Sequence, residues 1–206
     1  MVRFFNRVLL NLLLMKILNQ IGEVEVISEF LKSEINSKRF GKQILDALKN
    51  KSKKIITNPD LNNEKDNQFR KNLFGKVRGY GRNKDLFENF PEDVKWFKAI
   101  ITKQELKKVK YIDYSYWNEI SDNTRLPSKS SKNIKENVVI YDVSNDGFLE
   151  ILAEIKKGKT FPYMIFVAKN KKSQLVILEG HARLTSYYLE PRLIPDKIEI
   201  IVGYSD

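Results

Sequence analysis

A short segment near the C-terminus, Glu179-Gly180-His181-Ala182-Arg183, carries residue types suited to binding an anion. Gly180 stands where an apolar, strand-like run gives way to residues with helical spacing, and glycine lets the backbone turn sharply and approach a ligand closely. The first turn of a helix has N–H groups without partners and the positive end of the helix dipole. Because His181 and Arg183 lie in that turn, the segment predicts a phosphate-binding site.

Each of these side chains also has a structural alternative. His181, beside a glycine at such a turn, can be a capping or packing residue, and Arg183 can form an ion pair with Glu179 or Glu190. Glu179 can pair with the helix end, or it can be a carboxylate ligand to a phosphate-bound Mg²⁺. Bidentate pairing with phosphate oxygens is nevertheless the role to which a guanidinium is best suited.

A second acidic candidate lies upstream, in an aromatic segment. Glu119 is a candidate general base toward a hydroxyl acceptor, and Glu179 is the other candidate catalytic carboxylate. The neighbouring Tyr114, Tyr116 and Trp117 are expected to form a half-buried strand, with a stacking platform for a nucleobase as the alternative.

Composition excludes several classes of site. The 206 residues contain no cysteine and one histidine. A chain without cysteine has no disulfide scaffold, no thiolate nucleophile and no Cys-ligated zinc or iron–sulfur cluster. One histidine excludes metal sites that need several imidazoles, and a serine-type triad would have to use His181. No protein-held metal site is therefore predicted.

The net charge of +11 is concentrated in the first two thirds of the chain. Residues 32–84 contain 15 basic and 5 acidic side chains, whereas residues 137–206 contain 9 of each. Such a basic segment attracts polyanions. Residues 75–82, GKVRGYGR, lack the Gly-Lys-Ser/Thr of a phosphate-binding loop, so a flexible basic loop is expected there. The predicted nucleic-acid contacts are Lys51, Lys53, Lys54, Arg78 and Arg82.

Residues 1–18, MVRFFNRVLLNLLLMKIL, combine basic and apolar residues in the manner of a signal peptide. However, Asn11 and Lys16 interrupt the apolar run, and no small-x-small cleavage site follows. The longest uncharged stretch is also too short for a bilayer, which needs about 20 residues. We therefore expect an amphipathic helix, or an upstream extension if Met15 is the natural start, in a cytoplasmic protein without a membrane span.

The spacing of apolar residues predicts an α+β protein in two parts. Residues 1–106 are expected to be mainly helical, with helices over 23–49 broken near 36–37, a flexible basic stretch near 50–82 and an aromatic helical stretch over 86–101. Residues 107–206 are expected to form a small mixed α/β domain. Its expected elements are strands at 109–117 and 138–143, a loop at 126–133, a helix at 148–157, a hairpin of strands at 161–167 and 175–178, a helix at 181–189 and a strand at 197–202.

Residues 107–206 resemble the ParB/sulfiredoxin superfamily, in which a helix and a Gly-x-x-x-Pro segment lead into a strand and a hairpin ends in an acid-Gly-x-x-Arg-like turn. Arg125 is similar to the arginine that follows the first strand of ParB-type domains, and the resemblance adds it to the phosphate-binding set. The other matching residues are Gly158, Pro162, Glu179, Gly180, His181, Arg183 and Ser186.

The resemblance implies a site for ATP or CTP with Mg²⁺, in which Gly180 permits close approach, Arg183 pairs with the phosphates and His181 donates a hydrogen bond to them. Sulfinic acid repair, as in sulfiredoxins, is excluded because there is no cysteine. A full partition protein is not expected, since no helix-turn-helix region follows the last strand.

Two function classes remain. The first is a nucleoside triphosphate-binding protein, acting as an ATPase, a CTPase or a small-molecule phosphotransferase. The second is a nucleic-acid-binding protein, ParB-like or nuclease-related, that uses the basic N-terminal half while the C-terminal fold serves as a scaffold. The two can occur together, because ParB relatives bind both nucleotide and DNA.

Overall fold

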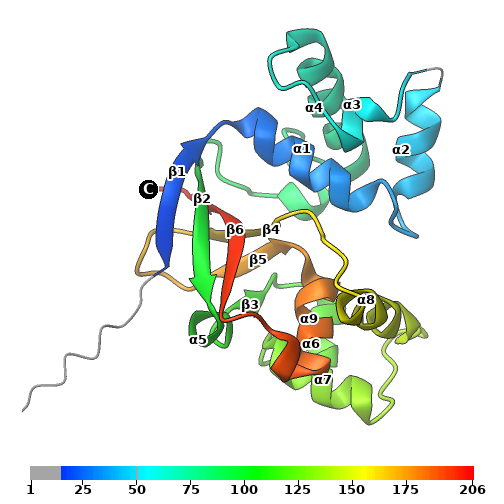
Figure 1. The fold of residues 1–206 in the computed structure, drawn as a ribbon, viewed down its shortest axis with the longest axis vertical. Coiled ribbons are helices and arrows are strands. Elements are labelled where there is room, and N and C mark those ends of the chain that lie inside the picture. The colour runs from blue at the N-terminus through cyan, green and yellow to red at the C-terminus, as the bar shows by residue number, and fades with distance from the viewer. Residues whose placement is uncertain (1–14, 50) are drawn as a thin grey trace, which may run out of the picture.

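The computed structural model describes residues 15–49 and 51–206. Six strands form one mixed sheet in the order β1-β2-β6-β4-β5-β3 (Figure 1). In chain order they are β1 (Lys16–Ile21), β2 (Lys95–Thr102), β3 (Lys110–Tyr111), β4 (Met164–Ala168), β5 (Val176–Glu179) and β6 (Lys197–Tyr204). The β1–β2, β2–β6 and β4–β5 pairs are antiparallel, while β4–β6 and β3–β5 are parallel. The predicted α+β class is confirmed.

Helices cover both faces of the sheet (Figure 1). One face carries α1 (Glu23–Glu34), α2 (Gly41–Leu48), α3 (Lys54–Thr57) and α4 (Glu64–Arg78). The other carries α6 (Ser115–Ile120), α7 (Pro127–Lys135), α8 (Asp146–Lys156) and α9 (His181–Leu189). The short helix α5 (Lys103–Leu106) follows β2, and single turns of 3-10 helix lie at Asp85–Phe87 and Pro191–Leu193.

The central strands are apolar on both faces because successive side chains of a strand point in opposite directions. Ile165 of β4 and Ile201 of β6 belong to the core that contains Phe30 of α1. Their neighbour Phe166 belongs to the other core, with Leu184 of α9. The sheet is therefore the middle layer between two helical layers.

The stretch expected to be a flexible loop near 50–82 is largely helical. Its main element is α4. Asn63 caps the start of this helix, where its side chain accepts the N–H of Asp66, and Gly79 caps the end in the left-handed conformation. One face of α4 buries Phe74 and Val77 against α1 and α2. The prediction was wrong because the charged residues on the solvent face of this helix outnumber the apolar residues that show its period.

The aromatic stretch at 86–101 is also not a helix. It contains a 3-10 turn and then β2, in which Trp96 belongs to one core and Phe97, Ala99 and Ile101 belong to the other. Both β1 and β2 join the sheet, so the sheet crosses the expected boundary between residues 106 and 107. Residues 16–18 belong to a strand, which contradicts a helix there, and residues 1–14 lie outside the described residues.

The hairpin, the helix at His181–Leu189 and the last strand of the C-terminal half are confirmed. Three expectations before them were wrong. The run at 109–117 is a strand only at Lys110–Tyr111 and then enters α6; the expected loop at 126–133 is α7; and 138–143 contains only an isolated bridge between Ile140 and Val143. Aromatic and β-branched composition favours strands only weakly, and Pro127 at the first position of α7 is a helix-start signal that outweighs the serines.

Candidate functional site

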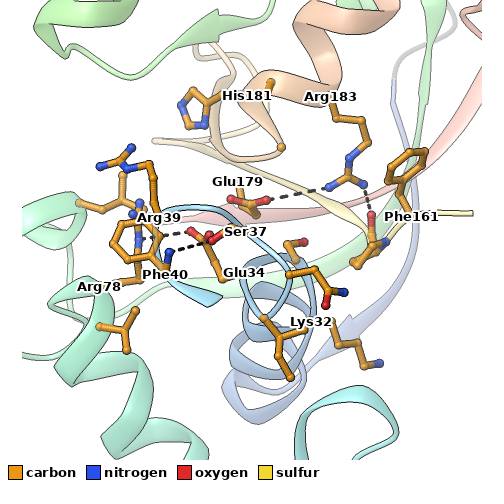
Figure 2. Close-up of a pocket in the computed structure, with 18 of the residues that line it drawn as sticks. Lys32, Glu34, Ser37, Arg39, Phe40, Arg78, Phe161, Glu179, His181 and Arg183 are labelled. Atoms are coloured by element: carbon orange, nitrogen blue, oxygen red, sulfur yellow. Dashed lines mark hydrogen bonds and ion pairs between the residues drawn. The ribbon is translucent and has the colours of Figure 1, made fainter. Parts of the chain in front are cut away.

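A cavity of about 1210 Å³ opens between the C-terminal end of α1 and the N-terminal end of α9. Figure 2 shows the charged side chains that surround it, with Glu179 between Arg183 on one side and the group of Arg39, Phe40 and Arg78 on the other. Five basic and five acidic residues line the cavity: Lys32, Arg39, Arg78, Lys159 and Arg183, and Glu34, Asp85, Glu88, Asp113 and Glu179.

Gly180 makes the turn that aims α9 at this cavity. Its φ of 98° lies in the left-handed region, which glycine adopts without strain. A Cβ at this position would lie 2.8 Å from Cγ of Met164, so the close approach that requires glycine is to β4 inside the protein. The carbonyl of Gly180 accepts the N–H of Leu184 at 2.9 Å. His181, Ala182 and Arg183, the first turn of α9, border the cavity.

Glu179 is the last residue of β5. Among the acidic residues of the cavity, its pKa departs furthest from the ordinary value. Its side chain is 16% exposed, and its Oε1 lies 4.0 Å from Nη2 of Arg183. Burial and the nearby Glu34 carboxyl raise the pKa of Glu179 to about 7, against the opposing effects of Arg183 and Arg78. Near neutral pH the carboxyl is therefore present in both protonated and ionised forms.

Arg183 forms the ion pair with Glu179 that was the structural alternative to phosphate binding. Its guanidinium donates from Nη1 to the carbonyl of Pro162 and forms the ion pair with Glu179. It also lies 5.4 Å from the ring centre of Phe161. Arg183 thus holds the segment before β4 against α9. Arg183 borders the cavity, but its side chain is only 10% exposed and its Nη1 is bonded within the protein.

A second ion pair, between α1 and α4, forms the opposite wall. Nε of Arg78 lies 3.6 Å from Oε1 of Glu34. Burial raises the pKa of Glu34 and lowers the pKa of Arg78, while each partner opposes the shift of the other. The guanidinium groups of Arg78 and Arg39 lie 4.3 and 4.9 Å from the ring centre of Phe40. Phe40 thus holds two cationic groups at the cavity wall.

His181 is neutral. Burial lowers its pKa to about 3, and the positive charges of Arg78 and Arg39 act in the same direction. Its ring stacks on Trp117 with 5.0 Å between centres and 18° between planes. Within the described residues its Nε2 is buried without a hydrogen-bond partner. The packing alternative is therefore realised, and the imidazole contributes no positive charge to the cavity.

Two predicted site residues lie elsewhere. Glu119 is exposed, accepts a hydrogen bond from the Tyr141 hydroxyl at 3.2 Å, and does not border the cavity. Arg125 also lies outside it. Its Nε and Nη2 donate to the carbonyl of Tyr111 at 2.9 and 2.6 Å, and its Nη1 lies 3.5 Å from Asp113. Arg125 lies in the loop between α6 and α7 and fastens this loop to the end of β3.

The predicted nucleic-acid contacts separate into two groups. Arg78 faces the cavity and pairs with Glu34, so it does not belong to the exposed basic surface. Lys51, Lys53, Lys54 and Arg82 are exposed and do not line the cavity.

Sequence reasoning did not find Glu34, Arg39 and Phe40, which border the same cavity as Glu179 and His181. The helix break predicted near residues 36–37 marked the turn that carries them. No local pattern indicated that this turn lies opposite the start of α9, because the two are far apart in the sequence.

A divalent cation would find few protein ligands here. Across residues 15–49 and 51–206, no three His, Cys, Asp or Glu side chains form a group that could hold a metal ion. Glu34 and Glu179 could supply one or two carboxylate oxygens, which suits Mg²⁺ only when phosphates and water complete its coordination.

Comparison with family models, with curated proteins and with solved structures found no match to this chain. Among the described helices, none combines the length and the apolar character that crossing a bilayer requires.

Proposed function

We propose that the protein binds a nucleoside triphosphate in this cavity, with the phosphates between the first turn of α9 and the guanidinium groups of Arg39 and Arg78. One observation carries the proposal. The positive end of a helix opens into a cavity whose facing wall presents two further cations, held there by Phe40. Helix N–H groups and guanidinium groups are the two kinds of donor that bind phosphate most strongly.

The cavity has equal numbers of basic and acidic residues, but its charges favour phosphate binding more than these numbers suggest. Asp85, Glu88 and Asp113 are exposed to solvent, where screening weakens their repulsion of an anion. Glu34 is paired with Arg78, and Glu179 is partly protonated near neutral pH. Arg39 forms none of the ion pairs among the described residues, so its charge is available to a ligand.

The reaction class that fits is hydrolysis of the nucleotide or transfer of its terminal phosphoryl group to a small hydroxyl acceptor. The nucleophilic oxygen forms a bond to the terminal phosphorus, the bond to the bridging oxygen breaks, and the nucleoside diphosphate leaves with that electron pair. Ionised Glu179 accepts the proton of the nucleophile, since a base with a pKa near the working pH is the most effective. Mg²⁺ carried by the nucleotide would neutralise phosphate charge.

The resemblance of residues 107–206 to the ParB/sulfiredoxin superfamily, whose members bind CTP or ATP phosphates at the corresponding turn, supports the same proposal. ATP and CTP are abundant in the cytoplasm, where we place the activity.

Calorimetric titration of ATP, CTP and GTP, with and without Mg²⁺, tests the proposal. We expect binding of at least one nucleotide and a loss of about 10-fold in affinity for Arg39→Ala, which removes one charged contact. Arg82→Ala is the matched control, because Arg82 is also exposed but lies outside the cavity. Absence of binding at millimolar nucleotide, or equal losses in both variants, would contradict the proposal.

Nucleic-acid binding is the second candidate. Lys51, Lys53 and Lys54 are exposed close together before and at the start of α3, and none of them takes part in the ion pairs of the described residues. Such unneutralised lysines favour phosphate contacts with a polyanion. This surface is separate from the cavity, so the two candidate functions can be tested independently.

A further inference from the structure

An exposed tyrosine, Tyr114, borders the cavity on the side of α6. The residue is 51% exposed, so its ring is accessible to a ligand in the cavity. It was expected to lie in a half-buried strand. Instead it immediately precedes α6 in extended conformation, with φ of −147° and ψ of 138°, so that its side chain does not follow the helix.

Hydrogen bonds fix the backbone that carries Tyr114. Its carbonyl accepts the N–H of Asn118 at 2.9 Å, and the side chain of Asn118 donates to Asp113 at 2.8 Å. Arg125, from the loop between α6 and α7, donates to the carbonyl of Tyr111 and lies 3.5 Å from Asp113, so this loop contacts the chain on the N-terminal side of Tyr114. The ring is therefore attached to a well-held turn, which reduces the entropy lost when a ligand packs against it.

Besides the exposed Asp113, the cavity lining that accompanies Tyr114 includes apolar side chains. Ile112 and Trp117, from the same segment, and Ile151 of α8 also border the cavity. The cationic lining formed by Arg39 and Arg78 comes from the α1–α2 loop and α4. A ligand that uses both linings needs an anionic part and a flat apolar part. A nucleoside triphosphate has this construction, whereas inorganic triphosphate has only the anionic part.

We propose that Tyr114 is a stacking platform for the nucleobase, which makes the ligand of this cavity a nucleotide rather than a simple polyphosphate. This inference rests on the proposed function and extends it to the base. Stacking on an exposed aromatic ring tolerates different bases because every base has a π-face. Tyr114 therefore increases affinity for nucleotides without choosing among them.

The test compares the nucleoside triphosphate that binds best with inorganic tripolyphosphate, by calorimetry on the full chain. Removing the ring in Tyr114→Ala should weaken nucleotide binding about 10-fold and leave tripolyphosphate binding within twofold. Tyr114→Trp, which keeps an aromatic face, should retain nucleotide affinity. Tyr141→Ala is the control, because Tyr141 is 59% exposed but does not line the cavity.

The outcomes separate the two proposals. If Tyr114→Ala leaves nucleotide affinity unchanged, or weakens tripolyphosphate as much as nucleotide, the stacking role is overturned while phosphate binding stands. If the wild-type protein binds neither probe, the proposed function and the stacking role are overturned together. Thermal unfolding of each variant shows whether a loss of binding comes from a loss of folding.

Discussion

At the scale of single residues, the cavity holds two groups whose acidities are shifted in opposite senses by the same cause. Burial favours the uncharged form of each group, so it raises the pKa of Glu179 to about 7 and lowers the pKa of His181 to about 3. Glu34, Arg78 and Arg183 face Glu179, and Arg39 and Arg78 act on His181. This arrangement gives Glu179 a carboxyl that can take up and release a proton near neutral pH.

This leads to a prediction for Glu179→Gln, which mimics the protonated carboxyl. The wild-type carboxyl has a pKa of about 7 when folded and an ordinary value of 4.5. Between pH 4.5 and 7 the folded protein therefore binds more protons at this group than the unfolded chain does. The contribution of this group to the free energy of unfolding is lost as the pH rises through that range. The wild-type protein should lose stability relative to Glu179→Gln by up to about 1 kcal/mol per pH unit from pH 4.5 to 7.

Urea unfolding of both proteins at several pH values measures this difference. His181 shifts the stability of wild type and variant alike, in the opposite sense, because its folded pKa is lowered. It therefore cancels in the difference between the two proteins. A difference that is constant from pH 4.5 to 7 would show that Glu179 is not buried as described.

At the scale of elements, α4 is held in place by a buried basic residue rather than by apolar contacts alone. Arg70 is 1% exposed, and its guanidinium donates to the carbonyls of Ile55 at 3.0 Å and Asp60 at 3.2 Å. It thus ties α4 to α3 and to the loop between them. One of the 15 basic residues in 32–84 is consequently internal and unavailable to a polyanion.

We expect Arg70→Ala to lower the free energy of unfolding by about 3 kcal/mol, because two buried carbonyls lose a charged donor and a large side chain is removed. Lys76→Ala, an exposed change on the same helix, should have little effect. Chemical denaturation gives both values. Limited proteolysis should find residues 64–78 protected in the wild type; rapid cleavage there would support the flexible-loop prediction instead.

At the scale of the whole molecule, the positive charge is divided between the cavity and an exposed surface. If that surface binds nucleic acid, affinity should fall with salt with a log–log slope of about −0.9 for each duplex DNA phosphate neutralised. Replacing Lys51, Lys53 and Lys54 together by alanine should flatten the slope. Fluorescence anisotropy with labelled duplex DNA at several salt concentrations measures it.

A second triple variant separates a local surface from net charge. Lys169, Lys171 and Lys172 are exposed in the turn between β4 and β5, and replacing them removes the same charge. Equal effects of the two triple variants would indicate non-specific attraction by the net charge of +11. Absence of binding at low salt would eliminate the nucleic-acid candidate.

The sequence was most informative where structure depends on neighbours in the chain. The strand–glycine–helix order around Gly180 is local: β5 ends, φ becomes positive, and α9 begins within a few residues. Apolar alternation and helical spacing identified these elements, since each follows from nearby side chains. The spacing of apolar residues did not identify α4 or β2. In α4 the solvent-facing charges, and before and in β2 the clustered aromatic residues, obscured the periodicity of the apolar side chains.

The sequence alone determined the α+β class, the absence of thiol chemistry, and the placement of Glu179, His181 and Arg183 beside a helix start. Only the tertiary structure decided what these residues contact. The α1–α2 turn lies opposite α9 because one sheet supports both helical layers, and this brings Glu34, Arg39 and Arg78 to the same cavity. Burial between those layers also sets the acidity of Glu179 and His181, and burial is a property of the packed molecule rather than of any segment.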